Sequence, residues 1–160
     1  MKKVLIALDY DPSAEIIAEK GYELAKALQA ETVLVHVIAE PAYYSSMDYS
    51  PVMGFTGFAG FSDVNIPEVI DELKVESKRF LDQSKEHLGD PGIKTLVTEG
   101  VFADSILEAA KQEAADIIVM GSHGRSGLNK LLTGSVAEQV LHHSSIPIYI
   151  IPTKSFENKE

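Results

Sequence analysis

An uninterrupted apolar run at residues 117–120 leads directly into a glycine-rich loop, and this junction constrains the fold more than any other part of the sequence. Four apolar residues without a polar break are typical of a central parallel strand, because helices cover both of its faces. Gly121, Gly124 and Gly127 follow, and Gly134 stands just before a segment of helical periodicity. Glycine lets backbone N–H groups turn toward one point, and a helix N-terminus adds unpaired donors. The stretch predicts a phosphate-binding loop; an ordinary glycine-punctuated connection is the alternative.

The rest of the chain alternates between short apolar runs and segments of helical periodicity. We expect strands at residues 4–8, 32–38, 93–98, 117–120 and 147–151, and the more mixed composition of 93–98 indicates an edge strand. Such alternation predicts an α/β fold: a doubly wound, five-stranded parallel sheet with four helices, Rossmann-like in its connections. In such sheets ligands bind beyond the carboxyl ends of the strands.

The four predicted helices each have one apolar face. We expect Asp11 to be the N-cap of the first helix and Pro67 to begin the second. The predicted inner faces are Ile17, Gly21, Leu24, Ala25 and Leu28; Val69, Ile70, Leu73, Phe80, Leu81 and Leu88; Ala103, Ile106, Leu107, Ala110 and Ala114; and Val136, Ala137, Val140 and Leu141.

Composition narrows the classes of function. The 160 residues contain no cysteine, which excludes thiolate metal sites and cysteine catalysis and fits a reducing cytoplasm. The formal net charge of −10 argues against nucleic acid as a partner, because phosphate contacts need a basic patch. No apolar segment approaches the length of a membrane span. We expect one soluble domain at residues 1–152, followed by a polar tail at 153–160.

Residues 39–65 differ from the rest of the chain. The segment is rich in aromatic residues and glycine and shows neither helical nor strand periodicity, which predicts a loop insertion. A lid, a dimer contact, a surface for an unknown protein partner, or a loosely folded insertion are all compatible with it.

The spacing Gly121-x2-Gly124-x9-Gly134-Ser135 resembles the nucleotide-binding signature of the universal stress protein family, in its ATP-binding branch. The segments VLIALD, VLVHV and SSIPIYIIP are also similar to that family, so the resemblance extends over residues 2–152. It implies the strand order 3-2-1-4-5, in which strands 1 and 4 are neighbours where the winding reverses. The loop after Leu8 would then lie beside the loop that begins at Gly121.

The resemblance also implies which residues bind the ligand, which would be ATP, or ADP or AMP, with Mg²⁺. Adenine would lie against Asp9 and Val37, with Ala7 nearby and Met120 at the end of the central strand. The residues implied to surround the ribose and phosphates are Gly121, Gly124, Gly134, Ser135 and Val136.

Other polar residues near these positions are candidates for contacts with the phosphates or the metal ion. Arg125 and Lys130 would screen the terminal phosphate or remain solvated loop cations. Asp11 or Ser13 would help hold the magnesium ion, although magnesium often relies on phosphates and water.

Several familiar catalytic patterns are absent from the sequence. It contains no P-loop, no G-x-G-x-x-G after the first strand and no G-x-S-x-G elbow. His36 is expected to be a hydrogen-bonded core histidine rather than a ligand. His123 lacks an evident orienting carboxylate, and the adjacent His142 and His143 cannot share one helix face. No catalytic residue is therefore assigned.

Three functional hypotheses follow. The first is a nucleotide-dependent stress-response module, the second a slow ATPase or phosphotransferase that uses the same pocket, and the third an interaction protein that binds no nucleotide. We also expect a homodimer through Ile148–Ile151, because an apolar edge strand left exposed would pair with other chains.

Overall fold

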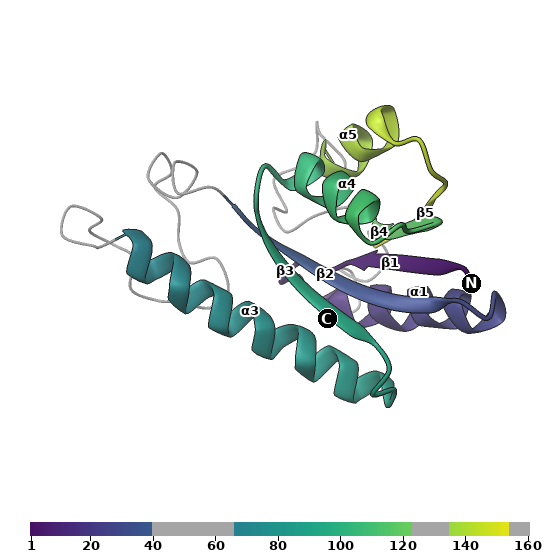
Figure 1. The fold of residues 1–160 in the computed structure, drawn as a ribbon, viewed down its shortest axis with the longest axis horizontal. Coiled ribbons are helices and arrows are strands. Elements are labelled where there is room, and N and C mark those ends of the chain that lie inside the picture. The colour runs from purple at the N-terminus through teal and green to yellow at the C-terminus, as the bar shows by residue number, and fades with distance from the viewer. Residues whose placement is uncertain (40–65, 123–134, 154–160) are drawn as a thin grey trace.

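The computed structural model describes residues 1–39, 66–122 and 135–153 of the chain (Figure 1). Strands and helices alternate along the described residues, as the apolar periodicity predicts. In order they are β1 (Lys3–Ala7), α1 (Ala14–Ala27), β2 (Glu31–Ala39), α3 (Ile66–Leu88), β3 (Lys94–Gly100), α4 (Phe102–Gln112), β4 (Ile117–Gly121), α5 (Ser135–His143) and β5 (Ile148–Ile151). The predicted segment boundaries agree with these to within a few residues; residue 39, placed in the loop insertion, is the buried last residue of β2.

The five strands form one parallel sheet in the order β3-β2-β1-β4-β5. This confirms both the doubly wound class and the order that the family resemblance implies. The predicted edge strand, β3, is at one edge, and β5 is at the other. Strand β1 is central: Leu5 pairs with Val33 of β2 on one side and with Ile118 of β4 on the other.

Helices cover both faces of the sheet: α1 and α3 lie on one face, and α4 and α5 lie on the other (Figure 1). Alternate residues of β1 therefore enter different cores. Val4 and Ile6 pack with Ile17 of α1, whereas Leu5 packs with Ile106 of α4. Each such buried aliphatic side chain stabilises the fold by about 1.5–3 kcal/mol. This burial on both faces explains the unbroken apolar runs in the sequence.

Three predictions about the helices are wrong in detail. Ala114 lies beyond α4, which ends at Gln112; it is exposed and takes a left-handed backbone conformation, with a φ of 53°. Leu141 of α5 is 60% exposed, although its spacing placed it on the inner face. Asp11 is not the N-cap of α1, because the cap position is Ser13. The Asp11 carboxylate instead accepts hydrogen bonds from the Ser13 N–H at 2.8 Å and Oγ at 2.6 Å.

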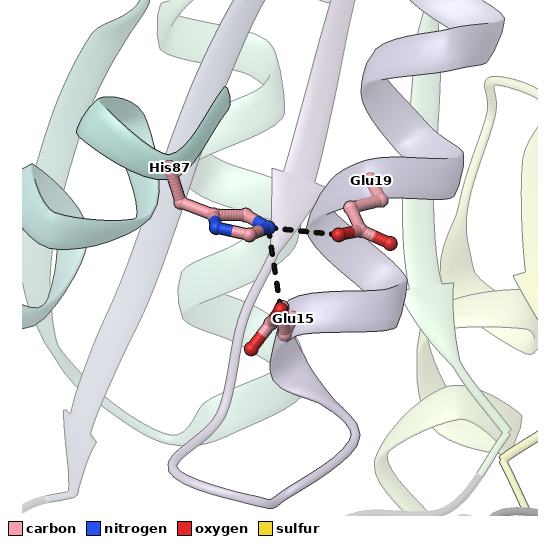
Figure 2. A group of neighbouring side chains, drawn as sticks. All are labelled: Glu15, Glu19 and His87. Atoms are coloured by element: carbon pink, nitrogen blue, oxygen red, sulfur yellow. Dashed lines mark hydrogen bonds and ion pairs between the residues drawn. The ribbon is translucent and has the colours of Figure 1, made fainter. Parts of the chain in front are cut away.

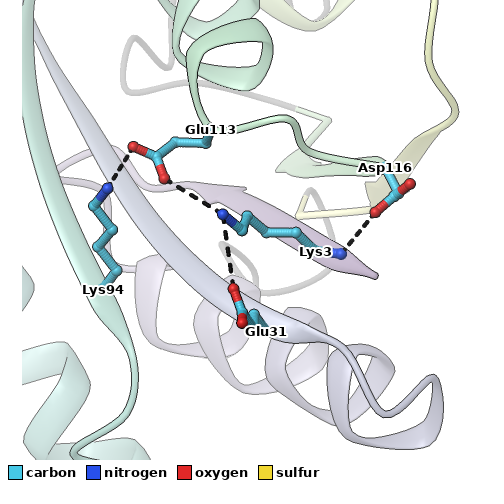
Figure 3. A network of polar contacts seen from close by, with 5 residues as sticks. All are labelled: Lys3, Glu31, Lys94, Glu113 and Asp116. Carbon is cyan, nitrogen blue, oxygen red and sulfur yellow. Dashed lines mark hydrogen bonds and ion pairs between the residues drawn. The ribbon is translucent and has the colours of Figure 1, made fainter. Parts of the chain in front are cut away.

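Ion pairs join the amino ends of the strands (Figure 3). The Lys3 Nζ lies 3.7 Å from both Glu31 and Glu113, and the Lys94 Nζ lies 2.7 Å from Glu113. The backbone N–H of Lys3 also donates to the Asp116 carboxylate at 2.8 Å. These residues begin or precede strands β1 to β4, so this edge of the sheet is held by paired charges. The carboxyl edge is the one at which a doubly wound sheet binds its ligands.

Candidate functional site

The candidate site lies where the winding direction of the sheet reverses. From β1 the chain passes to α1 on one face, and α5, between β4 and β5, covers the opposite face. Strands β1 and β4 are neighbours, with Ile6 paired to Val119. Ala7 and Met120 therefore stand one residue further along, at adjacent carboxyl ends. The helix that follows β1 and the helix that follows β4 cover opposite faces of the sheet. In doubly wound sheets this geometry opens a crevice between the two strand ends.

The four apolar residues predicted for the site belong to one hydrophobic cluster. Val37 and Met120 are buried in the core between the sheet and α4/α5, and Ala7 and Val136 are partly buried against it. They come from β1, β2, β4 and α5, so four separate segments bring them to the same face of the sheet. This face can supply an apolar wall for a flat ring.

Asp9 lies in the loop between β1 and α1. Hydrogen bonds hold the residues on both sides of Asp9. The Leu8 N–H donates to the Val35 carbonyl at 2.9 Å, so pairing with β2 continues past the end of β1. The Leu8 carbonyl accepts a hydrogen bond from the His36 Nδ1 at 2.8 Å. On the other side, the Tyr10 N–H donates to the Asp9 Oδ1 at 2.8 Å. These hydrogen bonds restrain the loop and the orientation of the Asp9 carboxylate.

His36 is confirmed as a hydrogen-bonded core residue, since its side chain is only 2% exposed. A carbonyl oxygen can only accept, so the contact with Leu8 places the hydrogen on Nδ1. Its ring also meets Tyr10 and Phe80, at centroid distances of 5.2 and 5.9 Å. Tyr10 and Phe80 were not singled out from the sequence as neighbours of the site.

Gly121 has a packing role that the sequence did not reveal. A Cβ atom at this position would stand 2.6 Å from Ile17 Cδ1 and 3.0 Å from Thr153 Cγ2. Gly121 is the first residue of the predicted phosphate loop. Its lack of a side chain also lets α1 and the segment after β5 approach it closely. Immediately after it, the Ser122 N–H donates to the Ile151 carbonyl at 2.8 Å, and the Thr153 N–H donates to the Ser122 Oγ at 3.1 Å.

The remaining predicted contacts fall partly outside the described residues. Gly124, Arg125, Lys130 and Gly134, together with His123 and most of the 39–65 insertion, lie there. Ser135 begins α5, so its backbone and that of Val136 belong to a first helical turn, whose N–H groups lack helical partners. This placement is compatible with the predicted phosphate contacts.

A further group of polar side chains joins α1 to α3 (Figure 2). The His87 Nε2 lies 2.8 Å from the Glu19 carboxylate and 3.3 Å from that of Glu15. The hydrogen bond to Glu19 and the charge of Glu15 raise the pKa of His87 above its usual value. The i, i+4 spacing of the two glutamates was the available sequence signal, but nothing in the sequence indicated His87 as their partner.

Carboxylate oxygens and an imidazole nitrogen can ligate a divalent ion, and these three atoms lie within 4.8 Å of one another. The side chains are largely exposed and already pair with each other, so the arrangement is explained without an ion. Within the described part of the chain, no helix is long and apolar enough to cross a bilayer.

A parallel sheet of this strand order, with helices on both faces, defines a doubly wound, Rossmann-like α/β domain. Residues 1–152 match the family model described as "Universal stress protein family". The chain therefore belongs to the universal stress protein family.

Relatives and solved structures agree with this assignment over nearly the whole chain. Universal stress protein MJ0577 of Methanocaldococcus jannaschii is 34% identical over 157 residues, which cover 96% of each sequence. A solved structure of MJ0577 superposes with a TM-score of 0.71 at 30% identity and covers 95% of this chain and 96% of its own. The fold is also that of UspA from Lactobacillus plantarum, with a TM-score of 0.73 at 21% identity over 94% of this chain and 97% of that one.

Two more distant structures of the same fold contain adenine nucleotides. One is a universal stress protein in complex with cAMP, with a TM-score of 0.59 at 19% identity over 94% of this chain and 95% of that one. The other is the universal stress protein from Archaeoglobus fulgidus in complex with dAMP, with the same TM-score and identity over 94% of this chain and 98% of its own.

Proposed function

We propose that the chain binds an adenine nucleotide, ATP in the first place, and acts as a nucleotide-dependent regulatory module in the stress response of the cytoplasm. The observation that carries this proposal is the convergence of Asp9, the apolar cluster and the start of α5 at one switch point. Family membership supports it, as do the cAMP and dAMP complexes of two relatives with the same fold.

Adenine is the base whose chemistry matches the side of the site that the structure describes. Its exocyclic amine donates hydrogen bonds, and the Asp9 carboxylate only accepts them. Guanine has a carbonyl oxygen at the corresponding position, which a carboxylate repels. Val37 and Ala7 belong to the apolar cluster and would cover a face of the ring. We therefore expect adenine to be preferred over guanine.

The phosphates need local donors, because the chain as a whole carries a net charge of −10. The first turn of α5 supplies unpaired N–H groups and the positive end of the helix dipole. We propose that Ser135 and Val136 contribute there, together with Gly124, Gly134 and Arg125 of the preceding loop.

Magnesium would accompany a bound triphosphate. Among the two residues predicted to help hold it, Asp11 already accepts two hydrogen bonds from Ser13 through Oδ1. These hydrogen bonds fit a structural role for Asp11 and Ser13, so we propose no protein ligand for the ion. The phosphates and water are its usual ligands in such sites.

The proposal is tested by releasing what the purified protein carries and by titrating the stripped protein with Mg-ATP. We expect an adenine nucleotide on release and a saturable heat of binding in the titration. Gly124→Val should abolish the binding because a side chain would occupy the phosphate loop. Gly127→Val, in the same loop but outside the Gly121-x2-Gly124-x9-Gly134-Ser135 signature, measures how much binding is lost when a side chain is added elsewhere in the loop, and we expect a smaller loss there. Binding that survives in Gly124→Val contradicts the proposed role of this loop in binding phosphate. A separate assay of phosphate release over time shows whether the bound ATP is hydrolysed.

We also propose that two chains pair through β5. In the sheet as described, β5 pairs with β4 along one edge, and its outer edge faces away from the sheet. Tyr149 in the middle of the strand is 45% exposed. An apolar edge of this kind is commonly covered by a second copy in a two-fold dimer.

A further inference from the structure

Tyr10, the residue after Asp9, reaches from the β1–α1 loop to α3. Its hydroxyl donates a hydrogen bond of 2.9 Å to the backbone carbonyl of Glu76. Its ring packs on Phe80, with the centroids 4.3 Å apart and the planes tilted by 31°. Glu76 and Phe80 are one helical turn apart, so a single turn of α3 makes both contacts.

The Tyr10 hydroxyl keeps the proton that it donates in this hydrogen bond. Burial, with the nearby charge of Glu76, raises the pKa of Tyr10 to about 12. Arg79, which pairs with the Glu76 carboxylate at 2.8 Å, opposes that shift in part. The hydroxyl therefore stays protonated at any physiological pH. A helical carbonyl has two lone pairs, so Glu76 can accept from Tyr10 and from its own helix at once.

Asp9 thus stands between two anchored residues. Leu8 is bonded to β2 through both its N–H and its carbonyl, and Tyr10 is bonded to α3. The backbone N–H of Tyr10 in addition holds the Asp9 Oδ1 at 2.8 Å. A displacement of α3 near Glu76 would pull on Tyr10, and through Tyr10 it would turn the carboxylate of Asp9.

We propose that Tyr10 is a positioning residue that couples α3 to the nucleotide site by fixing the carboxylate of Asp9. This rests on the proposed nucleotide-binding function and adds to it a route of regulation. Coupling between two sites is reciprocal. A bound nucleotide would hold Asp9 and hence steady the turn of α3 at Glu76, and whatever moves that turn would change the affinity for nucleotide.

The chain contains a matched control for this proposal. Tyr22 of α1 also donates its hydroxyl across to the α3 side, to the Asp90 carboxylate at 2.9 Å, in the turn after α3. Both bonds join distant segments through one hydroxyl group, but Tyr22 is not next to a predicted ligand residue. Tyr10→Phe and Tyr22→Phe each remove the same single atom. A purely structural role for Tyr10 predicts that the two variants behave alike.

The experiment compares the affinities for Mg-ATP and the melting temperatures of the wild type and both variants. We expect Tyr10→Phe to bind about 3- to 10-fold more weakly, the effect of losing one hydrogen bond, and Tyr22→Phe to bind as the wild type does. We also expect nucleotide to slow hydrogen exchange of the α3 amides around Glu76 in the wild type and in Tyr22→Phe. That protection should be reduced in Tyr10→Phe.

Equal affinities in Tyr10→Phe and the wild type, or an equal loss in both variants, overturn the proposal while leaving nucleotide binding intact. A wild type that binds no nucleotide overturns the proposed function and this coupling together. If Tyr10→Phe does not fold, Phe80→Leu perturbs the same contact from the α3 side and keeps the hydroxyl. It should then weaken binding, and unchanged binding in that variant counts equally against the coupling.

Discussion

Gly21 of α1 lies so close to Ile6 of β1 that no side chain fits between them. A Cβ atom at position 21 would stand 2.7 Å from Ile6 Cδ1 and 3.1 Å from Val119 Cγ1. Because Ile6 and Val119 are partners on β1 and β4, this glycine lets α1 rest on the two strands that form the switch point. The spacing of the site therefore depends on a helix position that touches no predicted ligand residue.

Gly21→Ala should destabilise the fold. Alanine favours a helix interior by about 1 kcal/mol, but overpacking a core costs about 1–3 kcal/mol. We expect a net loss of about 1 kcal/mol in the free energy of unfolding, measured by chemical denaturation. Ile6→Val removes the Cδ1 atom that a Cβ would meet, so the double variant should lose less than the sum of the two single losses. A more stable Gly21→Ala variant would contradict this contact.

The pairing of His87 with Glu15 and Glu19 should make stability depend on pH. The pKa of His87 is raised in the folded chain, so the charged histidine favours the folded state. This contribution is fully present below the ordinary histidine pKa and is lost as the pH rises through the raised folded value. His87→Gln should therefore lower the denaturation midpoint at pH 5.5 and have less effect at pH 8.5.

His142→Gln is the control for this experiment. His142 is an exposed histidine of α5, and its Nε2 lies 3.8 Å from the Glu138 carboxylate, too far for a hydrogen bond. A His87→Gln effect that is the same at both pH values, or that matches the effect of His142→Gln, would show that the cluster does not couple stability to protonation.

The fold was predictable because each element has its own local signal. The apolar runs of β1, β2 and β4 are unbroken since both sheet faces are covered, and the helices repeat their apolar residues on one side. The misplaced residues lie at helix ends or on exposed turns. Ala114 continues the helical spacing but follows the cap, and Leu141 continues it on a side that nothing described covers. The strand order came from family resemblance and not from periodicity.

The sequence predicted only those residues of the site that belong to recognisable motifs. The bond between Tyr10 and Glu76 joins residues 66 positions apart, and it depends on how α3 lies across the sheet. The packing of Ile17 against Gly121 is also a matter of tertiary approach, so a glycine that looked like a ligand contact has a second cause. Neither relationship leaves a periodic signal in the sequence.

Asp9→Ala should weaken ATP binding by about tenfold or more, because a hydrogen bond to a charged group contributes about 1.5–3 kcal/mol. The preference for ATP over GTP should fall with it, since the carboxylate is the group that distinguishes the amine of adenine from the oxygen of guanine. Competition between the two nucleotides, measured on the stripped protein, checks both effects. An unchanged preference would assign base recognition to a different residue.

Tyr149→Lys should convert the proposed dimer into monomers. The substitution places a charge in the middle of β5, at a position that is 45% exposed in the single chain, and lysine is a residue that natural edge strands use to prevent pairing. Light scattering at micromolar concentration should give twice the chain mass for the wild type and the single-chain mass for the variant. Val75→Lys is the control, because Val75 is a similarly exposed apolar residue, at 59%, on α3 and away from β5. A wild type that is already monomeric would contradict the dimer. A Tyr149→Lys variant that stays dimeric would place the contact between copies elsewhere.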